Sequence, residues 1–148
     1  MPTHRRTTLL SATMPPFVSK IANDFLTNPM MINTTSSIGK KPAIQQIYYD
    51  ISKMPKYQLL CLIMDDLDDF YGFIFCNTKR DVDALSEKLM KEGYACESMH
   101  GDLSQAQRER ALRKFKSKQC RILVVTDVAA RGIDVKDISC VINYSVPQ

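Results

Sequence analysis

The sequence of 148 residues predicts an α/β fold in which helices flank a parallel sheet. Three apolar runs, GFIFCN (72–77), RILVVTD (121–127) and CVINYSV (140–146), are typical of strands buried on both faces. Amphipathic stretches of about ten to fifteen residues separate such runs, which is the pattern of βαβ units. The crossovers of these units are expected to be right-handed. The length suffices for one full core, or for one domain with part of another.

The first part of the chain predicts two strands around one helix. TTLLSAT (7–13) and MMIN (30–33) have the composition of short strands. Pro15 and Pro16 suit the first turn of a helix, and Pro29 is expected to end it. The expected inner face of this helix consists of Val18, Ile21, Ala22 and Phe25. The polar segment TTSSIGKKP (34–42) shows no period and is the best candidate for a linker.

A strand and a helix are expected directly after this segment. AIQQIYYDI (43–51) is predicted to be a strand, and Pro55 to open a helix. Leu60, Ile63 and Leu67 would form the apolar stripe of that helix.

Two further helices are predicted from their capping residues. Thr78 with Asp81 resembles a capping box and starts a helix that Gly93 ends. Ser104 with Gln107 forms a second box, after the weaker strand ACESMH (95–100). The inward residues of these helices are expected to be Val82, Leu85, Leu89, Leu112 and Phe115.

Composition limits the classes of function without choosing one. The hydrophobic share of 45% and charged share of 24% are ordinary for a globular protein, and a net charge of +4 permits a polyanionic partner without requiring one. The five cysteines contain no CxxC pair and are expected to be buried, reduced thiols of an intracellular protein. With two histidines, no metal site is predicted. The apolar runs are too short to span a membrane, and the acidic stretch MDDLDDF (64–70) is interpreted as a solvated face.

Three polar segments are expected to meet at one edge of the sheet. Asn77–Arg80, His100–Asp102 and Thr126–Asp134 each follow a predicted strand. In open parallel sheets, ligands bind beyond the carboxyl ends of the strands. The two capped helices would present backbone N–H groups there, which form a ready site for phosphate.

Each of these segments also has a purely structural interpretation. Lys79 and Arg80 oppose the dipole of the helix that they begin, which a bound phosphate would explain, although they are also compatible with simple solvation. Arg108 is suited to form a bidentate hydrogen bond with a phosphate, or simply to lie on the surface of a capped helix. Asp134 is suited to bind the hydroxyls of a sugar, and Arg131 to pair with a neighbouring aspartate.

Taken in order, five segments closely resemble the motifs of DEAD-box RNA helicases. SAT (11–13) is similar to motif III of that family and IFCNTK (74–79) to motif IV. HGDLSQAQR (100–108) resembles the region with the QxxR element, and VVTDVAARGID (124–134) resembles motif V. VINYSVP (141–147) resembles the strand that follows. Ser145 departs from the family, which usually has Asp after Asn-Tyr.

The resemblance implies two RecA-like domains of the P-loop NTPase type. Residues 1–34 would be the C-terminal end of the first, ATP-binding domain, and residues 35–42 the linker. Residues 43–148 would be the second, helicase C-terminal domain, truncated before the arginine-finger motif HRxGRxGR.

The resemblance also implies a role for each matching residue. Ser11 and Thr13 would couple ATP hydrolysis to unwinding, Asp134 would contact the ATP ribose, and Arg131 would help the two domains to close. The residues implied in binding the RNA backbone are Asn77, Thr78, Gly101, Arg108 and Thr126. RNA, as a single strand or short duplex, and ATP are the expected partners, together with regulatory proteins.

The chain lacks the sequences that would make it an ATPase by itself. It contains neither GxxxxGK[ST] nor Asp-Glu-Ala-Asp. We therefore expect ATP and Mg²⁺ to act in the full-length parent and the 148 residues alone to bind neither and to be inactive. The expected location is the cytoplasm, or the nucleus in a eukaryote. The alternatives are a non-catalytic RNA-binding scaffold, a DNA helicase of the same superfamily, and an α/β protein that binds a small nucleotide.

Overall fold

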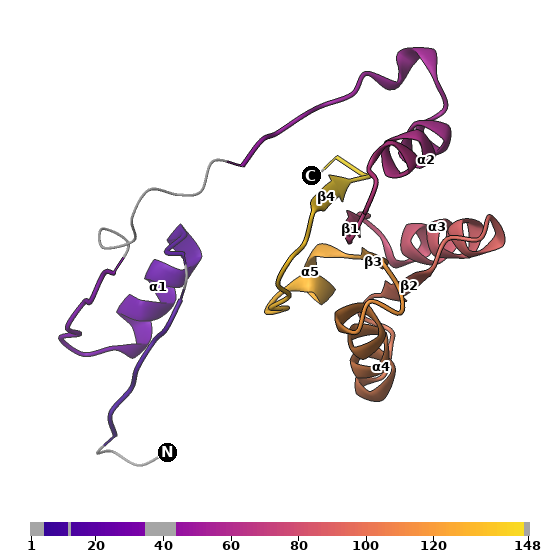
Figure 1. Ribbon diagram of the computed structural model, residues 1–148. Coiled ribbons are helices and arrows are strands. Elements are labelled where there is room, and N and C mark those ends of the chain that lie inside the picture. The colour runs from indigo at the N-terminus through magenta and orange to yellow at the C-terminus, as the bar shows by residue number, and fades with distance from the viewer. Residues whose placement is uncertain (1–4, 12, 35–43, 147–148) are drawn as a thin grey trace. The chain divides into compact units, whose positions relative to one another are not determined.

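The computed structural model describes residues 5–11, 13–34 and 44–146 in two compact units (Figure 1). The units are Met1–Ile47 and Tyr48–Gln148, and each is described by itself. The predicted linker, residues 35–42, lies outside the described residues. The assignment of the two units to two RecA-like domains stays a prediction.

The Met1–Ile47 unit contains the helix α1, Pro16–Phe25. Its start agrees with the prediction, because Pro15 is the N-cap and Pro16 fills the first turn. Its end does not, since the chain turns extended at Leu26, before Pro29 is reached. The expected inner face is confirmed for Val18, which is buried, and wrong for Ile21 and Phe25, which are exposed; Ala22 is half-buried.

The strands predicted at 7–13, 30–33 and 43–51 are wrong over the residues that the structure describes. A strand needs a neighbouring strand for its backbone N–H and C=O groups, and none of the described residues pairs with these segments. Residues 44–50 instead lead into the 3₁₀ helix η2, Ile51–Lys53. The Asp50 carboxylate accepts a hydrogen bond of 2.8 Å from the Ser52 N–H and so begins this turn.

The Tyr48–Gln148 unit contains a sheet of four strands, all parallel, as predicted. The strands are β1 (Gly72–Phe75), β2 (Cys96–Met99), β3 (Ile122–Val125) and β4 (Cys140–Asn143). Their order across the sheet is β2-β3-β1-β4. The register aligns Met99, Val125, Phe75 and Asn143, so the carboxyl ends of all four strands form one straight edge.

Helices cover both faces of this sheet (Figure 1). They are α2 (Lys56–Asp66), α3 (Lys79–Lys91), α4 (Gln105–Lys116) and the single turn α5 (Asp127–Ala130). One core cluster joins α2 and α3 to the face that carries Ile74 and Val124. The other joins α4 and α5 to the face that carries Phe73 and Leu123. The two central strands, β1 and β3, are therefore buried on both sides, which explains their continuous apolar sequences. The same prediction is wrong for β4, an edge strand whose residues are alternately half-buried and exposed.

The predicted helix interiors hold for α3 and in part for α2 and α4. Val82, Leu85 and Leu89 are buried in α3. In α2 the buried pair is Leu60 and Met64. The expected Ile63 and Leu67 are half-buried and exposed, and Leu112 of α4 is half-buried beside the buried Phe115. None of the helices in the described ranges combines the length and the apolar character needed to cross a membrane.

Candidate nucleic-acid interface

The three polar segments lie at one edge of the sheet, as expected from the parallel topology. Asn77–Arg80 follows β1, His100–Asp102 follows β2 and Thr126–Asp134 follows β3. Since β2, β3 and β1 are neighbours whose last residues are in register, the three segments leave the sheet side by side. This edge is the candidate interface.

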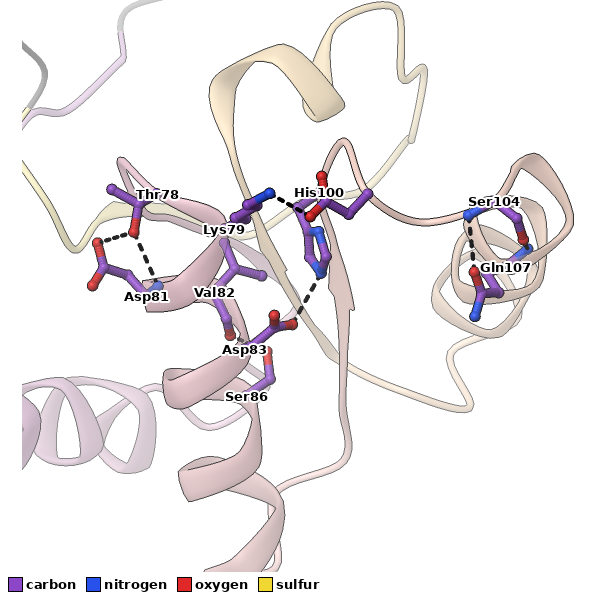
Figure 2. Close-up of polar contacts among 10 residues, drawn as sticks. Thr78, Lys79, Asp81, Val82, Asp83, Ser86, His100, Ser104 and Gln107 are labelled. Atoms are coloured by element: carbon purple, nitrogen blue, oxygen red, sulfur yellow. Dashed lines mark hydrogen bonds and ion pairs between the residues drawn. The ribbon is translucent and has the colours of Figure 1, made fainter.

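The segment after β1 uses its polar side chains within the fold. The Thr78 hydroxyl accepts a hydrogen bond of 3.1 Å from the Asp81 N–H and donates one of 2.8 Å to the Asp81 carboxylate (Figure 2). The Asn77 amide donates to the Val146 carbonyl at 2.9 Å, which fixes the chain after β4. Both side chains therefore have partners, and the capping role of Thr78 is confirmed.

Lys79, for which the sequence suggested a bound phosphate, instead has an aspartate of the second segment as its anionic partner. Lys79 forms a salt bridge of 2.5 Å with Asp102. The hydrogen bond from Lys79 lowers the pKa of the Asp102 carboxyl below its usual value. Because this pair offsets the unfavourable charge at the start of α3, Lys79 by itself is no evidence for a bound phosphate. Arg80 is exposed.

A second bridge between the same two segments was missed by sequence reasoning. His100 is 5% exposed, and its Nε2 lies 2.9 Å from the Asp83 carboxylate of α3 (Figure 2). Its Nδ1 is buried and has no partner in the described part of the chain. Asp83 follows Lys79 by one helical turn, and His100 precedes Asp102 by two residues. The sequence contains no local signal for this bridge, because Asp83 and His100 come together only through the order of the strands.

Gly101 lies between these two bridges and is a glycine that the fold does not require. Its φ lies outside the left-handed region, and a Cβ placed there would meet nothing within 4 Å. Gly72 in β1 is the opposite case, since its Cβ would stand 1.9 Å from the Cys140 carbonyl oxygen of β4. The structure thus assigns a packing reason to Gly72 and leaves Gly101 without one.

Arg108 connects α4 to the segment after β3. Its guanidinium donates to the Ala129 carbonyl at 3.3 Å, near the end of α5, and its side chain is half-buried. A groove lies beside this contact, between α4 and the turn that follows α5, and its lining includes Arg131 and Asp134. The turn itself depends on Gly132, which has a φ of 76°.

Three side chains of the third segment, unlike Arg108, are not fixed by a hydrogen bond or salt bridge that their position would suggest. Thr126 is the N-cap of α5, yet its hydroxyl makes no capping hydrogen bond. Arg131 and Asp134 are exposed. Within the described residues no salt bridge joins Arg131 to Asp127 or Asp134, so the structural pairing that the sequence left open is not found.

Two other groups singled out from the sequence lie elsewhere. Ser11 and Thr13 are exposed residues of the Met1–Ile47 unit, where the Ser11 hydroxyl donates to the Thr13 carbonyl. The acidic stretch 64–70 lies at the end of α2, where Asp69 pairs with Arg121 and Asp65 accepts a hydrogen bond from the Tyr94 hydroxyl. The described residues contain no group of three or more potential metal ligands.

Comparison with known proteins identifies the family. Residues 55–148 match the model of the helicase conserved C-terminal domain. The whole chain is 42% identical to a DEAD-box ATP-dependent RNA helicase, CshA, of Geobacillus kaustophilus, over 32% of that protein's length. A probable ATP-dependent RNA helicase of Methanocaldococcus jannaschii is 40% identical over 97% of this chain and 38% of its own. The chain belongs to the DEAD-box RNA helicases.

Solved DEAD-box structures share the fold as well as the sequence. A DEAD box protein from Methanococcus jannaschii aligns over 93% of this chain and 37% of its own, with 40% identity and a TM-score of 0.65. Saccharomyces cerevisiae Dbp5 bound to RNA and ADP BeF3 aligns over 93% of this chain and 35% of its own, with 29% identity and a TM-score of 0.76. The predicted RecA-like fold is therefore confirmed. The chain spans about a third of the length of the curated relatives it matches.

Proposed function

We propose that this DEAD-box chain binds the sugar–phosphate backbone of RNA along the carboxyl edge of its sheet and that the full-length protein unwinds short RNA duplexes with ATP. The observation that carries the proposal is a pair of positions at the ends of the neighbouring strands β2 and β3. At neither position does the fold require the residue that is present: Gly101 has open space where a Cβ would lie, and the Thr126 hydroxyl makes no capping hydrogen bond. A glycine with open space above it permits close approach of a phosphate, and a hydroxyl without a capping bond is free to donate to one.

Asn77, Thr78 and Arg108 are proposed to act differently from these two. Their side chains are committed to Val146, Asp81 and Ala129. They would then contribute to RNA binding through their backbone groups and by holding neighbouring residues in place. Alternatively, a side chain would give up its present hydrogen bond and form one to a phosphate instead. The two bridges, Lys79–Asp102 and His100–Asp83, hold the segments after β1 and β2 together and so fix the spacing between successive contacts.

The groove beside α4 supports the proposed nucleotide contact. Asp134 is exposed and forms no salt bridge in the described part of the chain, and its carboxylate is suited to accept hydrogen bonds from ribose hydroxyls. Arg131, which is exposed beside it, is available to a second domain. ATP with Mg²⁺ supplies the free energy for unwinding in this family. We propose that Ser11 and Thr13 couple that step to RNA, and that residues outside this chain hold the β- and γ-phosphates, since the chain contains no GxxxxGK[ST] sequence.

Binding of a fluorescent oligouridylate of about ten nucleotides tests the RNA site. We expect Thr126→Val to weaken binding by about tenfold, on the scale of one lost charge-assisted hydrogen bond. Gly101→Ala should weaken it to a similar extent, about tenfold, because its methyl group would occupy the space that the phosphate needs. The midpoint of urea unfolding should not change, because neither side chain supports the fold. Thr27→Val, the same chemical change at an exposed threonine of the Met1–Ile47 unit, is the matched control. Wild-type affinity in both variants would exclude this edge as the RNA site.

Two further measurements separate the alternatives. Equal affinity for the DNA oligonucleotide of the same sequence would favour a DNA helicase, since the 2′-hydroxyl is the group that distinguishes RNA. The purified 148-residue chain should show no RNA-stimulated ATP hydrolysis. Robust turnover would contradict the proposal that the phosphate-binding residues lie outside it.

A further inference from the structure

The positive charge of the chain is concentrated in one element. Residues 105–121, which comprise α4 and the turn after it, contain seven Arg and Lys residues and one Glu, a net charge of +6. The whole chain contains 20 Lys and Arg and 16 Asp and Glu, a net charge of +4. The other 131 residues therefore carry a net charge of −2. The mildly basic net charge of the protein therefore comes from α4 and the turn after it, not from the surface as a whole.

Several of these cations are already engaged within the fold. Arg108 donates to the Ala129 carbonyl, Lys114 pairs with Glu97, and Arg121 pairs with Asp69. The Lys118 ammonium lies 5.3 Å from the centre of the Tyr71 ring. These interactions account for four of the seven positive charges.

The other three cations form a basic face without an acidic partner in the described residues. The basic face consists of Arg110, Arg113 and Lys116, which are exposed and appear in no salt bridge. Their spacing of three residues places neighbours on one side of the helix, along about 9 Å of its axis. Neighbouring cations repel one another, but Arg113 and Lys116 lie in the last turn of α4, where the helix dipole favours positive charge and offsets part of that repulsion.

The basic face is continuous with the candidate interface. Lys116 lines the same groove as Arg108 and Asp134, whereas Arg113 and Arg110 lie outside the groove, on the exposed side of α4. The helix α4 starts at the carboxyl edge of the sheet, after the segment of Gly101, and the three cations follow one another along α4 in the direction away from that edge. A polyanion bound at the edge would therefore meet further cations at successive steps along one helix.

We propose that the basic face of α4 binds the phosphates of RNA that extends beyond the strand held at the sheet edge. The inference rests on the proposed RNA site, because continuity with that site is what favours RNA over an acidic protein as the partner. Exposed cations arranged along a path attract a phosphate backbone without reading its sequence. The basic face would thus add affinity for long RNA and leave the affinity for short RNA unchanged.

The test compares RNA lengths in a variant of the basic face. Arg110→Gln with Arg113→Gln removes two charges and keeps good helix-forming residues. Binding of the 148-residue chain to oligouridylates of about 8 and about 20 nucleotides is measured by fluorescence anisotropy over a range of salt concentrations. We expect the variant to bind the long RNA about three- to tenfold more weakly and the short RNA with little change. The slope of the salt dependence for the long RNA should fall by about 0.7 for each phosphate that the variant no longer neutralises.

Matched variants make each outcome decisive. Lys20→Gln with Lys53→Gln removes two exposed charges outside α4 that form no salt bridge and should leave both affinities unchanged. If the Arg110 and Arg113 variant binds long RNA as the wild type does, the inference is wrong, while the edge site is tested separately by Gly101→Ala. If Gly101→Ala leaves short-RNA binding intact and the basic-face variant still weakens long-RNA binding, the edge site fails and the basic face stands. If polyglutamate competes as well as RNA does, the assignment of RNA is overturned in favour of an acidic protein.

Discussion

At the scale of single residues, the candidate RNA-binding side chains fall into two groups: those that already make a hydrogen bond within the fold and those that do not. The Thr78 hydroxyl caps α3, whereas the Thr126 hydroxyl at the start of α5 makes no capping bond. The sequence predicted an RNA contact for both, although it also indicated the cap, because Thr78 is followed three residues later by Asp81. For Asn77 the sequence contains no such indication, since its partner is the distant Val146 carbonyl.

Two glycines, Gly72 at the start of β1 and Gly101 after β2, allow a direct test of this distinction. Gly72→Ala would place a Cβ 1.9 Å from the Cys140 carbonyl oxygen of β4, and neither backbone can move without breaking the pairing of β1 with β4. We expect the free energy of unfolding to fall by at least about 1–3 kcal/mol, the usual cost of overpacking. Urea unfolding followed by circular dichroism measures it.

Gly101→Ala is the control for this substitution, since its added methyl group meets nothing within 4 Å and should cost little stability. Equal unfolding midpoints for the Gly72 and Gly101 variants would show that β4 does not pack against Gly72 as described.

At the scale of elements, local signals predicted helices well and strands only where a partner exists. The caps of α3 and α4 depend on residues three apart, so the sequence contains all the information needed for them. The segments 7–13 and 30–33 have a strand-like composition, but strand formation depends on a neighbour that the described residues do not provide. The one-turn helix α5 was also missed, because four residues show no periodicity.

The capping box of α4 should contribute measurably to stability. The Ser104 hydroxyl accepts from the Gln107 N–H at 3.3 Å, and the Gln107 side chain accepts from the Ser104 N–H at 2.8 Å. Ser104→Ala leaves an N–H of the first turn without its partner, and we expect a loss of about 1 kcal/mol in the free energy of unfolding. Ser117→Ala, at the other end of α4, is the control because its hydroxyl donates to a carbonyl and caps no N–H group. A larger loss for Ser117→Ala than for Ser104→Ala would contradict this account.

At the scale of the whole molecule, the sheet divides the core of the Tyr48–Gln148 unit into two clusters, one against α2 and α3 and the other against α4 and α5. The continuous apolar strands predicted this arrangement, because a strand buried on both faces requires helices on both sides. The two bridges near Gly101 and the charge partners of Lys114 and Arg121 were not predictable, since they join residues that meet only when the sheet order is known.

Three buried cysteines distributed over this core predict a loss of stability at alkaline pH. Burial raises the pKa of the Cys76 and Cys96 thiols to about 11 and that of Cys120 to about 12, from an ordinary value of 9.0. As the pH rises above 9.0, these thiols ionise in the unfolded chain but stay protonated in the folded one. The unfolded state then binds fewer protons, so the free energy of unfolding falls with rising pH. The stabilisation is complete below that pH and is lost as the pH rises through the folded pKa values.

Urea midpoints measured at intervals from neutral pH to about pH 11 would follow this loss. The raised pKa values of Tyr57 and Tyr94, which are also due first to burial, act in the same direction. Cys120→Ala separates the contributions: it lowers stability at every pH by leaving a small cavity, but it should make the alkaline decline shallower because one buried thiol no longer titrates. A decline that keeps the same slope in this variant would show that the Cys120 thiol is accessible to solvent in the folded protein, contrary to its exposed fraction of 4%.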